Sequence, residues 1–211
     1  MRKLPQFVNR EEFDKLIEEA KKEREQYYMP RKEDYKPTGK RITQYIIAMC
    51  LGYGSGLRIS EIFGLQKKQN YTYKGESKII TSDIPPLTAD RVEEKFIRVI
   101  SGKGKKDRVV PFPAKLLSKA GITKAQLLKN LPLFVSYRSC QNWVTALGKK
   151  VLGKHITFHQ FRHGFCTALL NSGMPVHQVQ IYSGHARMDT LGIYAHANPE
   201  QGLGKYGEAF G

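Results

Sequence analysis

The order of helical and strand-like patterns along the chain constrains the fold class most strongly. Helical periodicity occurs at both ends of the chain, and strand-like runs occur only in the middle. Apolar residues keep helical spacing over residues 13–20 and again over 42–50. Runs of β type are confined to residues 71–112, and helical patterns resume after Pro113. The sequence therefore predicts a mostly α protein with one small antiparallel β-sheet, which is an α+β fold.

Local signals place the first helices. Asn9 followed three residues later by Glu12 is typical of a helix start. Residues 23–39 are charged, tyrosine-rich and hold two prolines, so they predict a loop. The second helix is expected to end in a glycine-rich turn at residues 52–56, and a short third helix to run through Leu65.

The middle of the chain predicts short strands. Residues 71–73 and 78–81 are strand-like, and residues 95–101 and 108–112 are joined by a glycine- and lysine-rich turn at 102–107. We expect the last two runs to form an antiparallel hairpin with a basic tip.

The rest of the chain predicts helices and a tail. Gln160, three residues after Thr157, indicates a capping box, and residues 198–211 are rich in glycine and predict a flexible tail. The expected helices are 113–120, 123–130, 140–150, 157–172, 175–182 and 187–196.

Length and charge bound the class of protein. The 211 residues suit one domain, 1–211, and the 35 Lys and Arg against 19 Asp and Glu give a net charge of +16. Such a charge favours a polyanion as partner. Nucleic acid is the expected one, because each lysine or arginine that neutralises a phosphate releases counterions and strengthens binding. Three scattered cysteines exclude a disulfide framework, and no apolar run approaches a membrane span, so we expect a cytoplasmic, DNA-associated protein.

The last quarter of the chain gathers groups that can act on a phosphodiester. His159, Arg162 and His163 stand close together, and His185 and Tyr194 follow. The arginine supplies fixed positive charge, the histidines can carry protons, and the tyrosine offers an oxygen nucleophile. Each residue alone has an ordinary structural explanation, but the set indicates phosphodiester transfer.

Two residues further upstream fit the same chemistry. Arg58 follows the glycine-rich turn, and a guanidinium fork can contact two phosphate oxygens at once. Lys103, in the basic hairpin, has two interpretations: it lies against a DNA backbone, or it protonates the leaving 5′ oxygen. The basic residues that follow it are expected to contact DNA: Lys105, Lys106 and Arg108.

A zinc site is the competing interpretation of the histidines. His155, His159 and His163 are spaced i, i+4, i+8. No HExxH signature or cysteine pair accompanies them, and Arg162 would place a cation beside the metal. The sequence therefore predicts no metal and no cofactor.

Taken together, the motifs resemble the tyrosine recombinase family of phage integrases and Xer-type proteins, over about residues 4–197. The resemblance concerns that family's catalytic domain, and five motifs in order make it specific. These are Gly56-Leu-Arg58-Ile-Ser-Glu61-Ile, Gly102-Lys103-Gly-Lys-Lys-Asp-Arg-Val-Val-Pro111, His159-Gln-Phe-Arg162-His163, Ser183-Gly-His185 and Ile193-Tyr194-Ala-His196.

The resemblance implies the tyrosine recombinase catalytic-domain fold and site-specific DNA cleavage and rejoining, through a 3′-phosphotyrosyl intermediate without metal or ATP. Tyr194 would be the nucleophile, Lys103 the general acid, and Glu61 and His163 supporting residues. The implied catalytic set is Arg58, Lys103, His159, Arg162, His185 and Tyr194.

The resemblance also implies partners and leaves alternatives. The expected partner is double-stranded DNA, bound as a tetrameric synapse by a protein that is a monomer when free. The N-terminal core-binding domain usual in the family is expected to be absent, which fits either an excised domain or a minimal enzyme. A non-catalytic DNA-binding protein that keeps the fold is the main alternative, and a metal-dependent nuclease is a second one.

Overall fold

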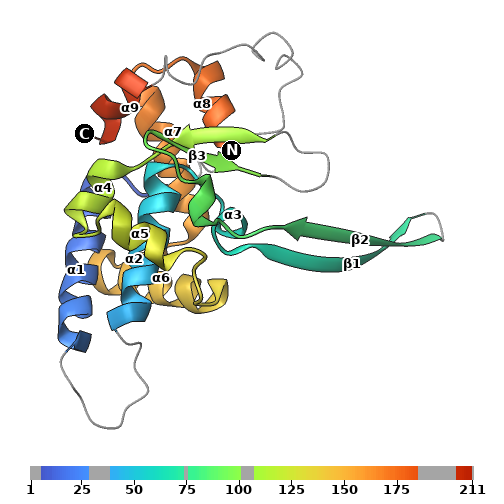
Figure 1. The fold of residues 1–211 in the computed structure, drawn as a ribbon, viewed down its shortest axis with the longest axis horizontal. Helices are drawn as coiled ribbons and strands as arrows, with labels where there is room; N and C mark the ends of the chain where they lie inside the picture. Colours follow the sequence, from blue (N-terminus) through green and yellow to red (C-terminus); the bar gives the residue numbers. More distant parts are fainter. Residues whose placement is uncertain (1–5, 29–38, 74–75, 101–106, 185–202, 211) are drawn as a thin grey trace.

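The computed structural model describes residues 6–28, 39–73, 76–100, 107–184 and 203–210, and it is mostly helical (Figure 1). The helices of the described part are α1 (Arg10–Tyr28), α2 (Gly39–Gly54), α3 (Ile59–Phe63), the 3₁₀ turn η1 (Ala89–Arg91), α4 (Ala114–Lys119), α5 (Lys124–Asn130), α6 (Tyr137–Leu152), α7 (Phe158–Asn171), α8 (Val176–Ser183) and α9 (Leu203–Phe210). The chain has the predicted α+β fold.

The strands of the described part form two separate antiparallel pairs, where the sequence led us to expect one sheet. Strands β1 (Leu65–Tyr73) and β2 (Glu76–Ile84) make a long hairpin that projects from the helical body (Figure 1). Strands β3 (Phe96–Val99) and β4 (Arg108–Pro111) pair beside α8, as expected for the basic hairpin.

Helix α3 is shorter than expected because of one glycine. Gly64 follows Phe63 with φ +76°, in the left-handed region that favours glycine, and the chain enters β1 at Leu65. The expected helix through Leu65 is therefore wrong by two residues.

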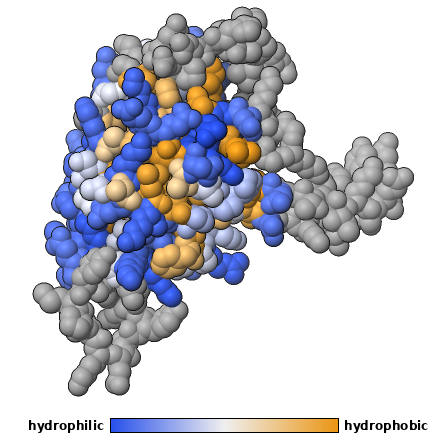
Figure 2. Space-filling view, in the orientation of Figure 1, coloured by the Kyte–Doolittle hydropathy of each residue, from blue (hydrophilic) through white to orange (hydrophobic). Residues whose placement is uncertain are grey.

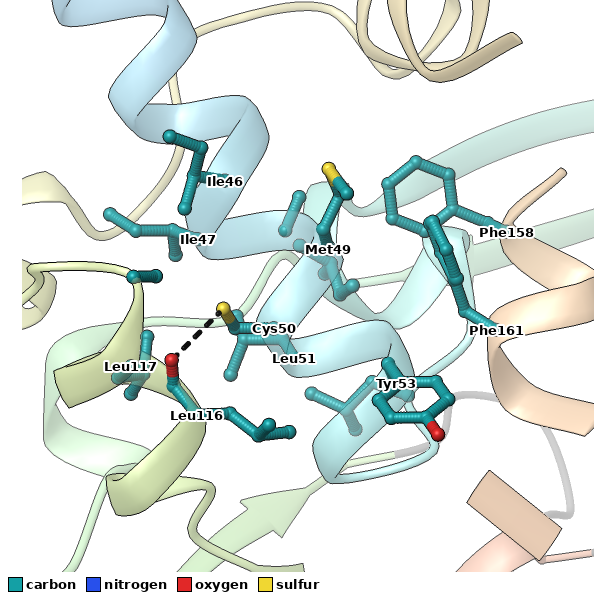
Figure 3. Close-up of a cluster of buried hydrophobic side chains, with 14 of the residues drawn as sticks. Ile46, Ile47, Met49, Cys50, Leu51, Tyr53, Leu116, Leu117, Phe158 and Phe161 are labelled. Atoms are coloured by element: carbon teal, nitrogen blue, oxygen red, sulfur yellow. Dashed lines mark hydrogen bonds between the residues drawn. The ribbon is translucent and has the colours of Figure 1, made fainter. Parts of the chain in front are cut away.

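Helix α2 runs through the middle of the hydrophobic core. Its side chains from Ile42 to Tyr53 are almost all buried, and Figure 3 shows Met49 facing the rings of Phe158 and Phe161 on α7. On another side, the buried Cys50 thiol lies near the carbonyl of Leu116 in α4. Burial of each such side chain contributes about 1.5–3 kcal/mol, so the core fixes where α2 ends and the turn after it begins.

The two predicted capping pairs start helices α1 and α7. The amide of Asn9 donates to Glu12 Oε2, and the amide of Glu12 donates to Asn9 Oδ1 at 2.8 Å. At α7, the amide of Thr157 donates to Gln160 Oε1 at 2.7 Å. These bonds satisfy amides that the first helical turn leaves without partners.

Two expectations about segment ends are wrong. A loop was expected over residues 23–39, but helix α1 continues to Tyr28, so residues 23–28 are helical. Within that expected loop, residues 29–38 lie outside the described residues. Residues 203–210, expected in a flexible tail, form α9, whose Phe210 is 1% exposed and stacks on Phe165 of α7. The helix expected at 187–196 lies outside the described residues.

The outer face of α1 is charged and faces solvent. Figure 2 shows hydrophilic residues along the edge of the molecule where α1 lies in Figure 1. None of the helices described in the structure is both long and apolar enough to cross a membrane.

Candidate active site

The glycine-rich turn after α2 places Arg58. Gly56 has φ +65°, and a Cβ at this position would lie 2.4 Å from the ring of Phe165, so only glycine fits. Arg58 then caps α3, and its amide donates to Glu61 Oε2 at 2.8 Å. The turn thus places Arg58 at the start of α3, from where its guanidinium reaches the carbonyl of Gly184 at the end of α8.

Arg162 is buried between the ends of two helices. It lies on α7, is 2% exposed, and its Nη1 donates to the carbonyl of Gly56 at 2.6 Å while Nη2 donates to the carbonyl of Ser183. The Ser183 carbonyl belongs to the last residue of α8, where carbonyl groups lack helical partners and carry partial negative charge, and the Gly56 carbonyl lies in the turn between α2 and α3. A cation is therefore stabilised there, and Arg162 joins the turn after α2 to the end of α8.

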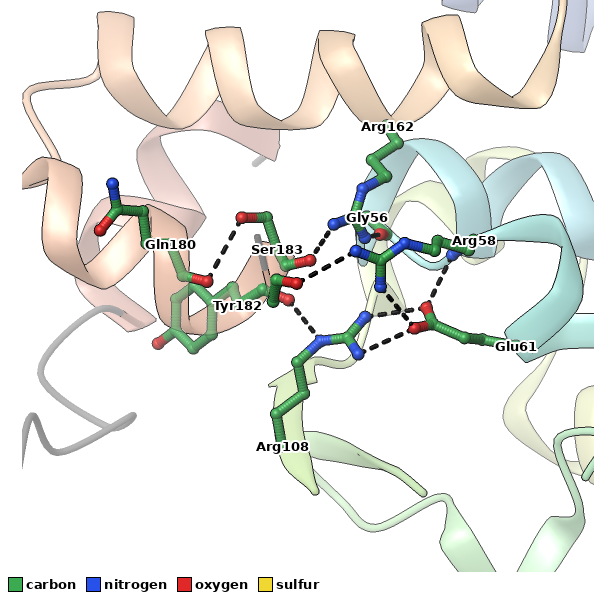
Figure 4. Close-up of polar contacts among 9 residues, drawn as sticks. Gly56, Arg58, Glu61, Arg108, Arg162, Gln180, Tyr182 and Ser183 are labelled. Carbon is green, nitrogen blue, oxygen red and sulfur yellow. Dashed lines mark hydrogen bonds and ion pairs between the residues drawn. The ribbon is translucent and has the colours of Figure 1, made fainter. Parts of the chain in front are cut away.

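Glu61 gathers two further guanidinium groups (Figure 4). Arg58 Nη1 donates to Glu61 Oε1 at 2.8 Å, and Arg58 Nη2 donates to the carbonyl of Gly184 at 3.0 Å. Arg108, at the start of β4, donates Nη1 and Nη2 to the two carboxylate oxygens of Glu61 at 2.9 and 2.8 Å. One carboxylate therefore links α3, β4 and the residue that ends α8.

Glu61 is ionised in this setting. Burial raises the pKa of its carboxyl, but the hydrogen bond and charge of Arg108, together with Arg58, outweigh burial and hold that pKa at about 2. A buried carboxylate that accepts two parallel bonds from an arginine is among the stronger charge pairs in proteins.

The arginines outnumber the carboxylate. Arg58, Arg108 and Arg162 carry three positive charges against the single negative charge of Glu61. Burial, followed by the nearby charges of Arg58 and Arg108, lowers the pKa of Arg162, which shows that its cation is held against repulsion. Arg58 keeps 31% of its side chain exposed, and the Nε of Arg162 has no partner among the described residues. The cluster therefore has the charge and the donors to receive an anion.

The two α7 histidines lie at the rim of this cluster. His159 is exposed, His163 is half-buried, and their ring centres are 4.4 Å apart. Burial, followed by Arg162 and Arg58, lowers the pKa of His159; burial, then His159 and Arg162, lowers that of His163. Both imidazoles are therefore uncharged at neutral pH and can accept a proton.

The zinc interpretation does not fit the local geometry. Helix α7 begins at Phe158, so His155 lies in the loop before it and does not continue the face of His159 and His163. Within the ranges that the structure describes, no three histidine, cysteine or acidic side chains gather as a metal site.

Arg108 lies elsewhere than we expected. The sequence suggested a DNA contact, but the side chain is 8% exposed, and its Nε donates to the carbonyl of Tyr182 at 2.8 Å. Its side chain belongs to the interior of the cluster in this structure, and the DNA contact expected of it stays a prediction. The other predicted site residues lie outside the described residues: Lys103, Lys105, Lys106, His185 and Tyr194.

Sequence reasoning missed the backbone acceptors of the site. The carbonyls of Gly56, Tyr182, Ser183 and Gly184 hold the three arginines. A carbonyl leaves no mark in a motif, and only the glycines at positions 56 and 184, both with positive φ, hinted that these turns are special.

Comparison with known proteins agrees with this geometry. Residues 6–201 match the phage integrase family. The chain belongs to that family. It is 33% identical over 159 residues to tyrosine recombinase XerA of Pyrococcus horikoshii, a match that covers 70% of this chain and 48% of the relative. It is 28% identical over 210 residues to a tyrosine recombinase of Thermosipho africanus, with 95% of this chain and 60% of the relative covered.

Solved structures of two recombinases share the fold. The crystal structure of XerA recombinase superposes with a TM-score of 0.58 at 25% identity, over 99% of this chain and 66% of that one. The XerH recombinase bound to its difH substrate matches with a TM-score of 0.53 at 20% identity, over 95% of this chain and 53% of that one. The present chain spans about half the length of the curated relatives it matches.

Proposed function

We propose that this chain is the catalytic part of a site-specific DNA recombinase or integrase, which cleaves and rejoins DNA through a covalent 3′-phosphotyrosyl intermediate. The observation that carries the proposal is the convergence of Arg58 and Arg162 on the ends of α2 and α8, with an excess of positive charge. These arginines come from distant parts of the sequence, in a chain of the phage integrase family.

The proposed reaction is a transfer of one phosphodiester bond. The oxygen of Tyr194 attacks phosphorus, the bond between phosphorus and the 5′ oxygen breaks, and Lys103 gives that oxygen a proton. The proton of the tyrosine passes to a neighbouring base, for which the uncharged His159 is suited. In reversal, a 5′-hydroxyl attacks the phosphotyrosyl bond, so no ATP is consumed.

The arginines act on the charge that develops on the phosphate. Arg58, the more exposed of the two, meets a non-bridging oxygen first, and Arg162 supplies charge from beneath. Donors held rigidly before the reaction cost no reorganisation in the transition state, and each is worth about 100- to 1,000-fold in rate. The network around Glu61 provides that rigidity.

The proposed partner is double-stranded DNA. The net charge of +16 supports it, as does the similarity in fold to the XerH site-specific recombinase, which was solved bound to its difH substrate. We further propose a monomer in solution and a tetramer on two duplexes, in a protein that works in the DNA-containing compartment. His185 and His163 complete the proposed site, with Lys105 and Lys106 on the DNA backbone.

A capture experiment tests the function without knowledge of the target sequence. The protein is incubated in EDTA with a library of duplexes. Each duplex carries a nick placed so that the cleaved end diffuses away, and the sequence around the nick is randomised. Adducts that survive SDS are isolated, their DNA is sequenced, and the modified residue is located by mass spectrometry. We expect phosphotyrosine at Tyr194 and an enriched DNA sequence.

The control variant is Tyr194→Phe, which keeps the ring and lacks the nucleophile. It should bind the enriched DNA as the parent does and form no adduct. A parent protein that binds DNA but forms no adduct with any member of the library would instead support a non-catalytic DNA-binding protein. Cleavage that disappears in EDTA would point to a metal-dependent nuclease.

A further inference from the structure

Arg108 has all the contacts of an internal anchor. Its side chain is 8% exposed, and the carboxylate of Glu61 that it holds is 3% exposed. Its three nitrogen atoms each donate to the protein: Nη1 and Nη2 to Glu61, and Nε to the carbonyl of Tyr182. A guanidinium engaged on both edges has little freedom to turn toward a ligand.

The partner of Arg108 is also the partner of Arg58. Glu61 Oε1 accepts from Nη1 of both arginines, and Glu61 Oε2 accepts from the amide of Arg58 and from Nη2 of Arg108. The orientation of Arg58 therefore depends on where the carboxylate is held. Among the residues that the structure describes, the other bond of its guanidinium goes to the carbonyl of Gly184.

We propose that Arg108 is a positioning residue that orients Arg58 through Glu61, and that it contacts no DNA itself. This inference rests on the proposed function for its effect on rate. Arg108 is also the first residue of β4, so the same anchor fixes the strand end that follows the segment of Lys103. One buried pair thus ties the start of β4 to the first turn of α3.

The alternative role, a direct phosphate contact, makes opposite predictions for DNA binding. A lysine or arginine that neutralises a phosphate releases counterions, and its loss reduces the slope of log Kd against log salt by about one. A positioning residue leaves that slope unchanged and lowers the rate of the bound complex, because a shift of about 1 Å in a catalytic group can cost about 100-fold.

The experiment measures Arg108→Met and Arg108→Lys against the parent on the DNA enriched in the capture experiment. The readouts are the rate of adduct formation at saturating DNA and the Kd at several salt concentrations. We expect about a 100-fold lower rate for Arg108→Met, a Kd within about threefold, and an unchanged salt slope. Arg108→Lys keeps the charge without the fork and should recover part of the rate.

The matched control is Arg98→Met, on strand β3 of the same hairpin. Arg98 is 55% exposed and pairs with Glu93 at the surface, so its loss removes the same charge without touching Glu61. It should leave the rate unchanged. A reduced salt slope with an unchanged saturating rate in Arg108→Met would overturn the proposal in favour of a DNA contact.

A double-mutant cycle tests whether Arg108 acts through Glu61. If it does, the rate of Arg108→Met in a Glu61→Gln background should fall little further than in Glu61→Gln alone. Fully additive losses would overturn the proposed route. Melting curves show which variants fold. If Arg108→Met does not fold, Arg108→Lys replaces it in the cycle with Glu61→Gln.

An NMR readout separates this inference from the proposed function. Solvent exchange of the Arg58 Nη protons, which bond Glu61 and the carbonyl of Gly184, should be faster in Arg108→Met than in the parent and unchanged in Arg98→Met, whether or not the protein forms an adduct. Unchanged exchange in Arg108→Met would overturn the positioning role even in an active enzyme. A parent without adduct but with the expected exchange would overturn only the proposed function.

Discussion

Two charge clusters of this protein have opposite balances and very different surroundings. Around Glu61, one carboxylate pairs with Arg58 and Arg108 beside a third cation, Arg162, and the carboxylate side chain is 3% exposed. Between α1 and α6, one lysine, Lys150, meets Glu19 and Glu23 at 2.8 and 2.9 Å, with 55% of its side chain exposed. The distances are alike, so distance alone does not tell what each cluster contributes.

The difference lies in what the charges have lost on folding. Water has been removed from the Glu61 cluster, so its charges depend on one another and on the helix-end carbonyls. Lys150 remains hydrated, and its bonds to Glu19 and Glu23 replace bonds to water at little net gain, although they raise its pKa. We therefore expect changes in the first cluster to be costly and changes in the second to be small.

Removal of Arg162 should have the largest effect. Arg162→Ala takes away a buried positive charge that we propose lies beneath the phosphate, and it leaves the carbonyls of Gly56 and Ser183 without the donor that Arg162 provides. We expect the rate of adduct formation to fall by about 1,000-fold while DNA binding changes little. Single-turnover rates on a nicked duplex measure this, with the exposed Arg138→Ala on α6 as control. A loss of less than tenfold would contradict the proposed role of Arg162.

Glu61→Gln tests the buried pair through the acid dependence of stability. The pKa of Glu61 is lowered from an ordinary 4.5 to about 2, so its ionisation stabilises the fold above pH 4.5 and loses that effect as the pH falls toward 2. At pH 7 the contribution corresponds to about 3 kcal/mol. The free energies of unfolding of parent and variant should therefore differ at neutral pH and converge between pH 4.5 and 2.

Urea unfolding at a series of pH values measures this convergence. The control is Glu93→Gln, a surface carboxylate that pairs with Arg98 and is 51% exposed. Its curve should stay parallel to that of the parent. A gap between parent and Glu61→Gln that is constant from pH 7 to 2 would mean that the carboxylate is not selectively stabilised by its arginines.

His159, at the rim of the buried cluster, should give a smaller pH effect, on the rate of DNA cleavage. Burial and the nearby arginines lower the pKa of His159 below 6.5, so its imidazole stays neutral at pH 7 and becomes charged only in more acidic solution. We expect the cleavage rate to be level near pH 7 and to fall below pH 6.5, with about a tenfold loss at neutral pH in His159→Gln. His155→Gln, in the loop before α7, should keep the parental profile. An acid limb above pH 6.5 would contradict this assignment.

The sequence predicted what depends on neighbours along the chain. The helix starts at Asn9 and Thr157 were found because each capping residue is satisfied by a side chain three residues on. The strands of the basic hairpin were found from two β-type runs joined by a glycine- and lysine-rich turn. The end of α1 at Tyr28 was missed because its polar, charged last turns lack the apolar spacing that marks a buried helix.

The parts that were missed depend on contacts between distant segments. Helix α9 is held by Phe210 against Tyr53 and Phe165, and no local pattern in a glycine-rich segment indicates that docking. Arg108 looked like one more cation of a basic hairpin, and only the approach of Glu61 reveals it as an internal partner. The motifs identified candidate residues, whereas their buried or exposed role came from packing.

The exposed cluster supplies the last and smallest prediction. Lys150→Met removes the cation shared by Glu19 and Glu23, and Glu23 keeps its bond from the indole of Trp143 at 3.1 Å. Because all three charges are near water, we expect the free energy of unfolding to change by less than about 1 kcal/mol, and the change to vanish in about 1 M salt. Urea unfolding at low and high salt measures it, with the adjacent exposed Lys149→Met as control. A salt-independent loss near that of Glu61→Gln would show that exposure does not separate the two clusters, and that charge count alone governs them.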